Sequence, residues 1–490
     1  MSNSQPNILL MVMDTARAKT VLGSEEVMPN FHRIAEEGTL FTNAFSTAPW
    51  TLPSHASMFT GQYTSDHNTH AGNKLFVPDV PTIAELLHEA GYQTVAFSNN
   101  VWISPEFGFD RGFDQFTTNL QLLDGGADLP SIAKEKNGIL DQSKAIARTL
   151  LQRDGHRTLI NAIYAKFLRK RYDSGALLTN WRIRRWLSKS RDPNRPFFMF
   201  VNYLEPHLEY DPPKKFREKF LPDGINTSKL ESVNQDAWAY ICGQVEMDER
   251  DFEALSALYK AELRYLDYRI CRVYEYLKSA ELLEETMIII VGDHGENIGD
   301  HGLMDHQYCL YDTLLHVPLL VRYPSEFPGD EQRDKFVELC DMYPTLLEAA
   351  EVDQAENSTV SSKPLQQTLT ESGHEYMIAE YITPQPSMNA LKERTGALPE
   401  KVHKYDQGLR SIRKGRWKVI VGSDNSTRLY DLIEDSSEQS DVSEENETIV
   451  TELISTLEAR LGSFDTGKSV DNHEIESTIQ GRLEDLGYLQ

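Results

Sequence analysis

The sequence predicts an α/β fold with a mainly parallel sheet flanked by helices. Four short apolar runs have the length of buried strands: residues 8–13, 94–98, 197–203 and 287–291. Helical patterns lie between them, over 82–90 and, as a long amphipathic stretch, over 252–283. Strands that alternate with helices are typical of a parallel sheet covered on both faces. We therefore predict one large domain over residues 1–372.

The composition changes after residue 372. Residues 375–382, 409–421 and 428–432 have strand patterns, the acidic and Ser-rich stretch 434–447 has that of a loop, and 449–461 that of a helix. This portion predicts a small C-terminal α+β subdomain, 373–490, with an antiparallel sheet. We expect a polar tail over 463–475 and a short docking helix over 475–489.

Composition and charge narrow the class of protein. The chain has 490 residues, 40% of them hydrophobic, and a formal net charge of −26. Such acidity argues against nucleic-acid binding and favours solubility. Four distant cysteines match neither a zinc pattern nor a disulfide framework: Cys242, Cys271, Cys309 and Cys340. No apolar stretch reaches the ~18 residues that span a bilayer, and the N-terminus lacks the charged region of a signal peptide. We expect a cytoplasmic protein.

One segment departs from the acidic character. Residues 148–191 carry many Arg and Lys side chains among regularly spaced apolar residues, as amphipathic helices do. This basic helical insertion is either a solvated surface or a contact for an anionic partner, such as a lipid headgroup layer at a membrane. The sequence leaves both alternatives open, together with the oligomeric state.

Metal-binding side chains follow three of the predicted strands. Asp14 comes after the first run, His207 shortly after the third, and Asp293-His294 after the fourth. In parallel sheets chemistry gathers where the carboxyl ends of the strands meet, so we expect these residues to lie together. Two carboxylates and an imidazole are suitable ligands for a divalent cation.

Thr51 is placed to attack an anionic group. It stands where an apolar stretch ends, and Pro53 suits the first turn of a helix. The free N–H groups and the dipole at a helix start hold anions, so a hydroxyl there suits attack on a phosphate or sulfate ester. The alternative is that Thr51 only caps the helix.

With these residues identified, the chain resembles the sulfatase family of the alkaline phosphatase superfamily. The matching segments run in order through nearly the whole chain: 6–14, 48–61, 91–94, 203–210, 263–267, 292–296, 317–321 and 417–420. The resemblance implies an alkaline-phosphatase-like catalytic domain. It also implies a divalent metal ion on Asp14, Thr51, Asp293 and His294, and a substrate-binding histidine at His207.

The chain departs from the sulfatases at the nucleophile. Sulfatases proper carry Cys or Ser at this position, which is oxidised to formylglycine, and an Arg where this chain has His55. The secondary alcohol of Thr51 cannot give that aldehyde, so we expect no formylglycine and direct attack by the hydroxyl. In this respect the chain resembles phosphoryl-transferring relatives, namely nucleotide phosphodiesterases, lipoteichoic acid synthases and phosphoethanolamine transferases.

Two lysines of the family pattern are also replaced. The Gly-Lys pair after the second strand is Ser98-Asn99, and the later Lys aligns with His306. His306 is then a candidate general acid or substrate-binding cation. The catalytic candidates are thus Thr51, His207 and His306, and the substrate-binding candidates are His55, Asn73 and Asn99.

We expect one divalent metal ion, Mn, Mg, Zn or Ca, with Glu205, His207 and Asp211 as an alternative second site. The predicted function is metal-dependent hydrolysis of sulfate or phosphate esters with Thr51 as the nucleophile. The alternatives are a phosphoryl-group transferase, of the phosphoethanolamine or phosphoglycerol transferase kind, and a catalytically silent scaffold. We expect an anionic ester substrate, with a lipid or a glycan as candidates.

Overall fold

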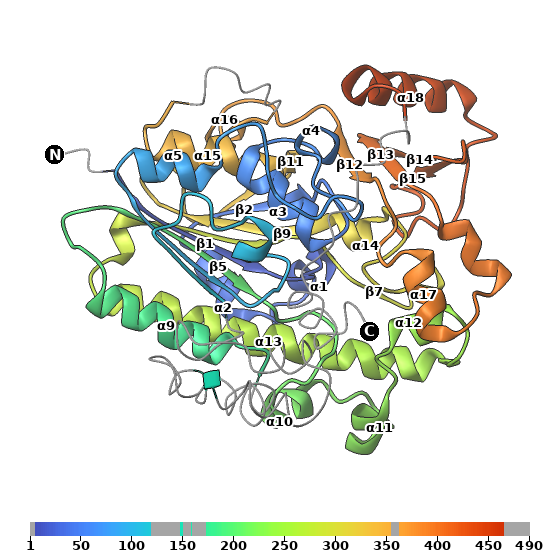
Figure 1. Cartoon of the computed structure of the whole chain (residues 1–490), viewed down its shortest axis with the longest axis horizontal. Coiled ribbons are helices and arrows are strands. Elements are labelled where there is room, and N and C mark those ends of the chain that lie inside the picture. Colours follow the sequence, from blue (N-terminus) through green and yellow to red (C-terminus); the bar gives the residue numbers. More distant parts are fainter. Residues whose placement is uncertain (1–4, 119–147, 150–157, 159–172, 354–361, 465–490) are drawn as a thin grey trace.

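The computed structural model describes residues 5–118, 148–149, 158, 173–353 and 362–464 (Figure 1). A large sheet runs through the main body, in the order β10-β2-β9-β6-β1-β5-β3-β4, with β11 beside β2. Its strands are β1 (Asn7–Met13), β2 (Thr39–Phe45), β3 (Gln93–Ser98), β4 (Gln115–Thr118), β5 (Phe197–Tyr203), β6 (Thr286–Gly292), β9 (His316–Arg322), β10 (Glu331–Arg333) and β11 (Val337–Glu338). The fold class predicted from the sequence is confirmed.

The centre of the sheet is parallel and fully buried. β1 pairs in parallel with β5 on one side and with β6 on the other, and every residue of these three strands is buried. Continuous apolar strands of this kind are stable only when helices cover both faces. The register places Met13 beside Tyr203 and Gly292, so the residues that follow these strands begin at one edge.

Strand β9 breaks the parallel arrangement. It pairs antiparallel with both β2 and β6. The sequence pattern did not identify β2 or β9 as strands, and the direction of β9 depends on how the loop after His306 returns to the sheet. The sheet is therefore mainly, but not entirely, parallel.

Helices form a layer on each face of the sheet (Figure 1). One layer contains α2 (Pro29–Ala35), α9 (Ala176–Lys189) and α13 (Glu249–Ser279), and the other contains α3 (Thr51–Thr60), α5 (Ile83–Glu89) and α15 (Met342–Ala349). The long helix α13 starts earlier than predicted, because Asp248 and Asp251 form a reciprocal capping box. It also ends earlier, just before Glu281, which takes a left-handed φ of 59°.

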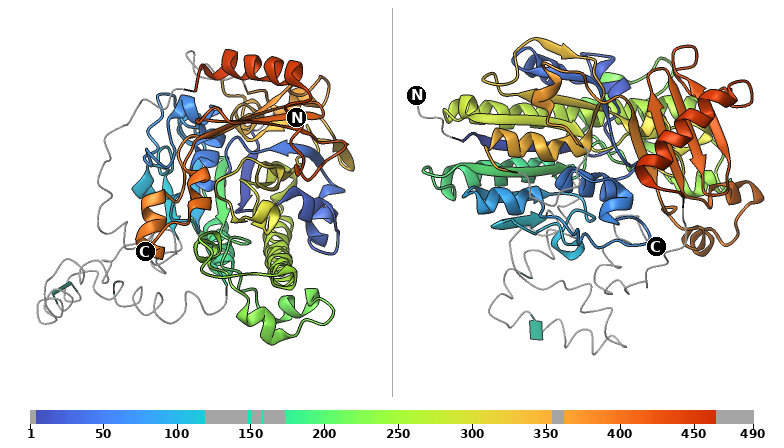
Figure 2. Two further views of the ribbon diagram at one scale, coloured as in Figure 1. Left: turned by 90° about the vertical axis from the view of Figure 1, so that its right-hand side faces the viewer. Right: turned by 90° about the horizontal axis from the view of Figure 1, so that it is seen from above.

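The C-terminal part forms a second sheet with the predicted antiparallel pairing (Figure 2). Its strands are β12 (Met377–Tyr381), β13 (Leu409–Lys414), β14 (Trp417–Gly422) and β15 (Thr427–Asp431), and α18 (Glu447–Leu461) packs across them. Leu453 and Leu457 of α18 share a small core with strand residues such as Ile412 and Val419. The sheet is thereby covered on one face by its own helix.

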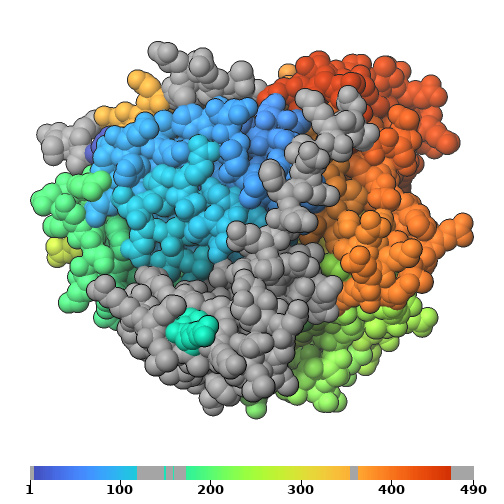
Figure 3. All heavy atoms as spheres, in the orientation of Figure 1, coloured from blue at the N-terminus to red at the C-terminus, as the bar shows by residue number. Residues whose placement is uncertain are grey.

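Buried charges join the C-terminal sheet to the main body, against which it packs directly (Figure 3). The Lys418 ammonium on β14 lies 2.6 Å from Asp312 Oδ1 and 2.7 Å from Glu438 Oε1. Asp312 begins α14 (Asp312–Leu315), which leads into β9. Arg413 of β13 pairs with the same carboxylate at 2.7 Å. The second sheet is therefore attached to the segment that leads into strand β9 of the main sheet.

Some predicted segments fall outside the described residues. These are most of the tail over 463–475, the helix over 475–489 and much of the basic segment 148–191. Helix α9, at the end of that segment, exposes Leu177, Trp181, Arg184 and Arg185, while contact with an anionic lipid surface stays a prediction. Of the helices that the structure describes, none combines the length and apolarity needed to cross a membrane.

Candidate active site

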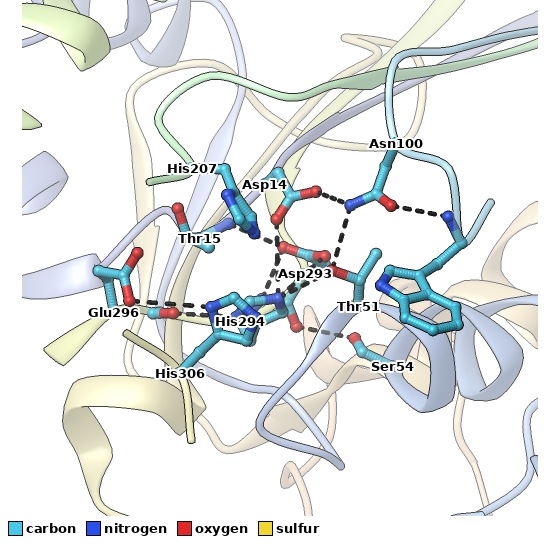
Figure 4. Close-up of polar contacts among 12 residues, drawn as sticks. Asp14, Thr15, Thr51, Ser54, Asn100, His207, Asp293, His294, Glu296 and His306 are labelled. Atoms are coloured by element: carbon cyan, nitrogen blue, oxygen red, sulfur yellow. Dashed lines mark hydrogen bonds and ion pairs between the residues drawn. The ribbon is translucent and has the colours of Figure 1, made fainter. Parts of the chain in front are cut away.

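The predicted metal ligands meet at the carboxyl edge of the main sheet (Figure 4). Asp14 follows β1, and Asp293 and His294 follow β6. His294 Nε2 lies 3.7 Å from Asp14 Oδ1 and 3.5 Å from Asp293 Oδ2. All three side chains are fully buried. The structure thus brings together three residues that lie up to 280 positions apart in the chain.

In each of these candidate ligands, one side-chain atom has a hydrogen-bond partner and the other faces the cluster. Asp14 Oδ2 accepts from Asn100 Nδ2 at 2.6 Å, and Asp293 Oδ1 accepts from the N–H groups of Thr15 and His294 at 3.1 and 2.9 Å. Asp14 Oδ1 and Asp293 Oδ2 accept no hydrogen bond. His294 Nδ1 lies 2.9 Å from the Gly295 carbonyl, which leaves Nε2 as the acceptor. Such orphaned buried oxygens fit a divalent cation.

The two buried carboxylates of this cluster also favour the binding of a cation. Burial raises the pKa of Asp14, and burial together with the Asp14 charge raises that of Asp293 well above its usual value. Burial and the nearby His306 lower the pKa of His294 well below its usual value. Two buried carboxylates beside a neutral imidazole stay ionised together only with a nearby positive charge.

Thr51 is the first residue of α3 and faces this cluster. Its Oγ1 lies 3.2 Å from His294 Nε2 and 3.4 Å from Asn100 Nδ2. Trp50, the residue before the helix, is extended, so the chain turns into the helix at Thr51. The helix start is thus directed at the predicted metal ligands, and its first N–H groups lie beside the hydroxyl.

His55, predicted to bind substrate, lies beneath the cluster. Its Nδ1 is 2.9 Å from the Thr51 carbonyl and 3.6 Å from Asp293 Oδ2, and its Nε2 is 3.4 Å from Asn202 Nδ2. Burial lowers the pKa of His55 to about 4, so the ring is neutral near pH 7. The ring has no exposed surface, and these contacts position Asp293 and the start of α3.

Asn100, rather than Asn99, faces the site. Asn99 Oδ1 accepts from Thr179 Oγ1 on α9 at 2.9 Å, whereas Asn100 reaches Asp14 and Thr51. Successive side chains of an extended segment point in opposite directions, which explains the difference. The Trp102 N–H donates to Asn100 Oδ1 at 2.9 Å, so the amide NH₂ faces the cluster. The signal in the sequence was an Asn pair directly after a strand.

Asn73, the third substrate-binding candidate, lies outside the cluster. Its Nδ2 donates to the Asn68 carbonyl at 2.7 Å, and its backbone pairs with His70. These contacts close a turn after α4 (Thr64–His67). The structure therefore does not bring Asn73 together with Thr51.

His306 lies beside the predicted metal ligand His294 and the predicted catalytic residue His207. Its ring centroid is 4.6 Å from that of His294 and 5.1 Å from that of His207. Its Nδ1 is 2.5 Å from Asp305 Oδ1 and 3.8 Å from Glu296 Oε1. Burial alone disfavours a charged ring, but these two carboxylates raise the pKa of His306 well above its usual value. In the absence of a metal, the two carboxylates therefore favour the protonated form of the His306 ring.

The alternative second metal site does not form. Glu205 Oε1 accepts from the Ala176 N–H at the start of α9 at 3.2 Å, and Asp211 pairs with Arg217 at 2.6 Å. Within the described ranges, neither carboxylate belongs to a group of close metal-binding side chains. Glu205 and Asp211 instead have partners of their own, which sequence spacing alone does not show.

A small cavity of about 150 Å³ adjoins the cluster. Its lining includes His207 and His306 and three indole rings, those of Trp50, Trp102 and Trp238. Arg394 stacks on Trp238 and pairs with Asp236 at 2.8 Å on the same wall. A cavity that combines indole rings with charged and polar side chains, beside this cluster, is suited to the organic part of an ester.

Comparisons with known proteins show the family of this chain. The sulfatase family model matches residues 6–352. An arylsulfatase of Clostridium perfringens is 27% identical over 71% of this chain and 75% of its own length, and arylsulfatase K of Canis lupus familiaris is 24% identical over 97% and 86%.

A solved structure supports the fold independently. The phosphonate monoester hydrolase of Agrobacterium radiobacter superimposes with a TM-score of 0.68 at 20% identity, over 93% of this chain and 96% of its own. A match to the family over most of the chain, together with the shared fold and the assembled site, identifies the chain as a member of the sulfatase family.

Proposed function

We propose that this chain is a metal-dependent hydrolase of phosphate or sulfate esters in which the Thr51 hydroxyl itself is the nucleophile. The position of Thr51 Oγ1 carries the proposal. It lies 3.2 Å from His294 Nε2 at the start of a helix, beside two carboxylate oxygens without hydrogen bonds. No other hydroxyl among the contacts of the described cluster reaches His294.

The ligand set for the metal consists of Asp14, Asp293, His294 and the Thr51 hydroxyl. A divalent cation bound there would lower the pKa of that hydroxyl and offset the charge of the substrate. The chain itself supplies the rest. The Asn100 NH₂ orients Asp14 and Thr51, and the first N–H groups of α3 receive the oxygens of the anionic group.

His207 and His306 act on the side of the reacting group opposite Thr51, where the alcohol departs. As the bond from Thr51 Oγ1 to phosphorus or sulfur forms, the bond to the departing alcohol breaks, and the hydroxyl proton passes to solvent. The Nε2–H of His306 donates its proton to the departing oxygen, because Nδ1 is engaged by the carboxylates. Water then attacks the Thr51 ester, so that one of its protons returns to Thr51 Oγ1 and the other stays with the released anion. His306 Nε2 regains its proton from solvent, which received the Thr51 proton in the first step.

The names of the relatives indicate a class of substrates. Two are arylsulfatases and one structural neighbour is a phosphonate monoester hydrolase. The proposal therefore covers esters with one anionic tetrahedral group and an organic part that fits the tryptophan-lined cavity. The direct threonine nucleophile favours phosphoryl over sulfuryl substrates by analogy with relatives that use threonine in this way.

The experiment compares wild type, Thr51→Ala and Thr51→Ser on aryl phosphate monoesters, phosphodiesters, phosphonate monoesters and sulfate esters. Each is assayed with Mn²⁺, Zn²⁺, Mg²⁺ and Ca²⁺. We expect Thr51→Ala to lose at least ~10³-fold in kcat, as removal of a nucleophile does, and Thr51→Ser to keep part of it. Thr60→Ala is the matched control, because Thr60 ends the same buried helix and its Oγ1 contacts only nearby backbone, donating to the Ala56 carbonyl and accepting from the Gln62 N–H.

Covalent trapping gives an independent readout. Rapid quenching should leave one phosphoryl or sulfuryl group on the peptide that contains Thr51. Equal turnover by wild type and Thr51→Ala would overturn the nucleophile assignment. Product formation only after an acceptor alcohol is added would instead identify a group transferase.

A further inference from the structure

A second set of donor side chains lies directly beside the Asp14 cluster. Glu296, Asp305 and His306 each place one ligand atom within 4.8 Å of the others. Glu296 follows β6, and Asp305 and His306 end the short hairpin of β7 (Asn297–Ile298) and β8 (Met304–Asp305). Figure 4 shows Glu296 and His306 on the far side of His294 from Thr51. The two sets are therefore neighbours on one edge of the sheet.

The outer oxygen of each carboxylate is held by a donor. Tyr210 Oη donates to Glu296 Oε2 at 3.3 Å, and Gln307 Nε2 donates to Asp305 Oδ2 at 2.5 Å. The inner oxygens, Glu296 Oε1 and Asp305 Oδ1, face His306 Nδ1. Asp305 Oδ1 also accepts the His306 N–H at 2.7 Å. Carboxylates oriented in this way by outer partners are typical of metal ligands.

A proton on His306 does not satisfy this arrangement. His306 Nδ1 lies 2.5 Å from Asp305 Oδ1 and 3.8 Å from Glu296 Oε1, and its geometry forms a hydrogen bond with neither oxygen. Glu296 is fully buried, and its Oε1 accepts no hydrogen bond. A buried carboxylate oxygen without a partner is costly. One cation between the three side chains would satisfy both oxygens and the ring nitrogen.

We propose that Glu296, Asp305 and His306 bind a second divalent cation, of the Mn²⁺ or Zn²⁺ class, beside the one held by Asp14, Asp293 and His294. Two carboxylates and one imidazole suit these ions, and their two negative charges balance the ion. Binding through Nδ1 leaves the Nε2–H of His306 directed away from the ion, where it can donate a hydrogen bond to the departing oxygen. With this ion bound, the proton for that oxygen comes from water. The proposal does not depend on Thr51 being the nucleophile.

Metal stoichiometry tests the proposal without an activity assay. Chelator-treated protein is titrated with Mn²⁺, and free Mn²⁺ is followed by electron paramagnetic resonance. We expect two tight ions in wild type, one in Asp14→Asn, one in Glu296→Gln and none in the double variant. Two neighbouring Mn²⁺ ions couple magnetically, so the bound spectrum should broaden in wild type and sharpen in each single variant.

Glu205→Gln is the matched control, because Glu205 is another fully buried carboxylate near the site that belongs to neither set. It should still bind two ions. Circular dichroism verifies that each variant is folded, and Asp305→Asn replaces Glu296→Gln should that variant unfold.

The outcomes separate this proposal from the proposed function. One ion in wild type that is lost in Asp14→Asn would overturn the second site and leave the first intact. Two ions that persist in both Glu296→Gln and Asp305→Asn would also overturn it. No binding of Mn²⁺ or Zn²⁺ by folded wild type would overturn the second site and the role of these ions at the first site. Trapping of the Thr51 adduct would then test the nucleophile by itself.

Discussion

Asn100 Nδ2 lies 2.6 Å from Asp14 Oδ2 and 3.4 Å from Thr51 Oγ1. One amide group therefore contacts both a candidate metal ligand and the candidate nucleophile. The Trp102 N–H holds the amide oxygen at 2.9 Å. The residue that orients the site thus comes from the end of β3, while the two groups it orients come from β1 and α3.

Removing this amide should weaken the metal site rather than the fold. We expect Asn100→Ala to lower metal affinity or kcat by roughly 10- to 100-fold, the usual effect of losing a group that orients a ligand. Metal titration and steady-state kinetics measure it. Asn99→Ala is the matched control, because its side chain contacts Thr179 on α9, and a larger loss in Asn99→Ala than in Asn100→Ala would contradict the assignment.

A buried histidine should make stability depend on pH. His374 Nε2 lies 2.9 Å from both oxygens of Asp341. Burial opposes the charged ring, but Asp341 outweighs it and raises the pKa of His374 to about 9. Because the folded-state pKa lies above the unfolded value of about 6.5, this stabilisation is complete below about pH 6.5 and disappears as the pH rises through about 9.

We therefore expect His374→Gln to reduce the free energy of unfolding by about 2–3 kcal/mol near pH 6 and by much less near pH 10. Urea unfolding of both proteins at the two pH values measures the difference. His88→Gln removes an exposed partner of Asp114, 3.3 Å away, and should have little effect at either pH. A His374 effect that does not change with pH would refute the pairing.

The buried ion pairs at Lys418 should stabilise the join between the two sheets. Lys418→Met leaves Glu438 buried without its cation and leaves Asp312 with Arg413 alone, although burial already raises the pKa of Glu438 to about 7. We expect a loss of roughly 3–5 kcal/mol in the free energy of unfolding. Arg416→Met, which removes the exposed pair with Asp431 at the start of the same strand, should cost about 1 kcal/mol or less.

Equal effects of Lys418→Met and Arg416→Met in urea unfolding would show that burial of the pair is unimportant. Adding Glu438→Gln to Lys418→Met should restore part of the lost stability, because it removes the unpaired charge.

The tryptophan-lined cavity should select the organic part of the substrate. We expect Trp238→Phe to raise KM for naphthyl esters by about 2- to 10-fold, from the loss of aromatic contact, with kcat little changed. KM values across methyl, phenyl and naphthyl esters measure the effect. Trp181→Phe, on the exposed face of α9, serves as the control. A uniform change in kcat for all three esters would place Trp238 in the chemistry instead.

The sequence predicted the parts of the fold that depend on local pattern. The runs that became β1, β5 and β6 are continuous and apolar, which is visible without any contact. The antiparallel strand β9 was not found, because His316, Pro318 and Arg322 shorten and interrupt its apolar run. Its direction in the sheet depends on the path of the preceding loop. The same loop carries His306 and Asp305.

For the site, the sequence by itself determined which residues stand at the ends of strands and at the start of a helix: Asp14, Thr51, Asp293 and His294. Periodicity and turn signals are local, so they place a residue along its own element. Only the tertiary structure decided that Asn100 faces Thr51 and that Glu296 and Asp305 surround His306. The direction of a side chain in a loop, and the residues it contacts, depend on elements that are hundreds of residues away in the chain. A local sequence pattern carries no information about such contacts.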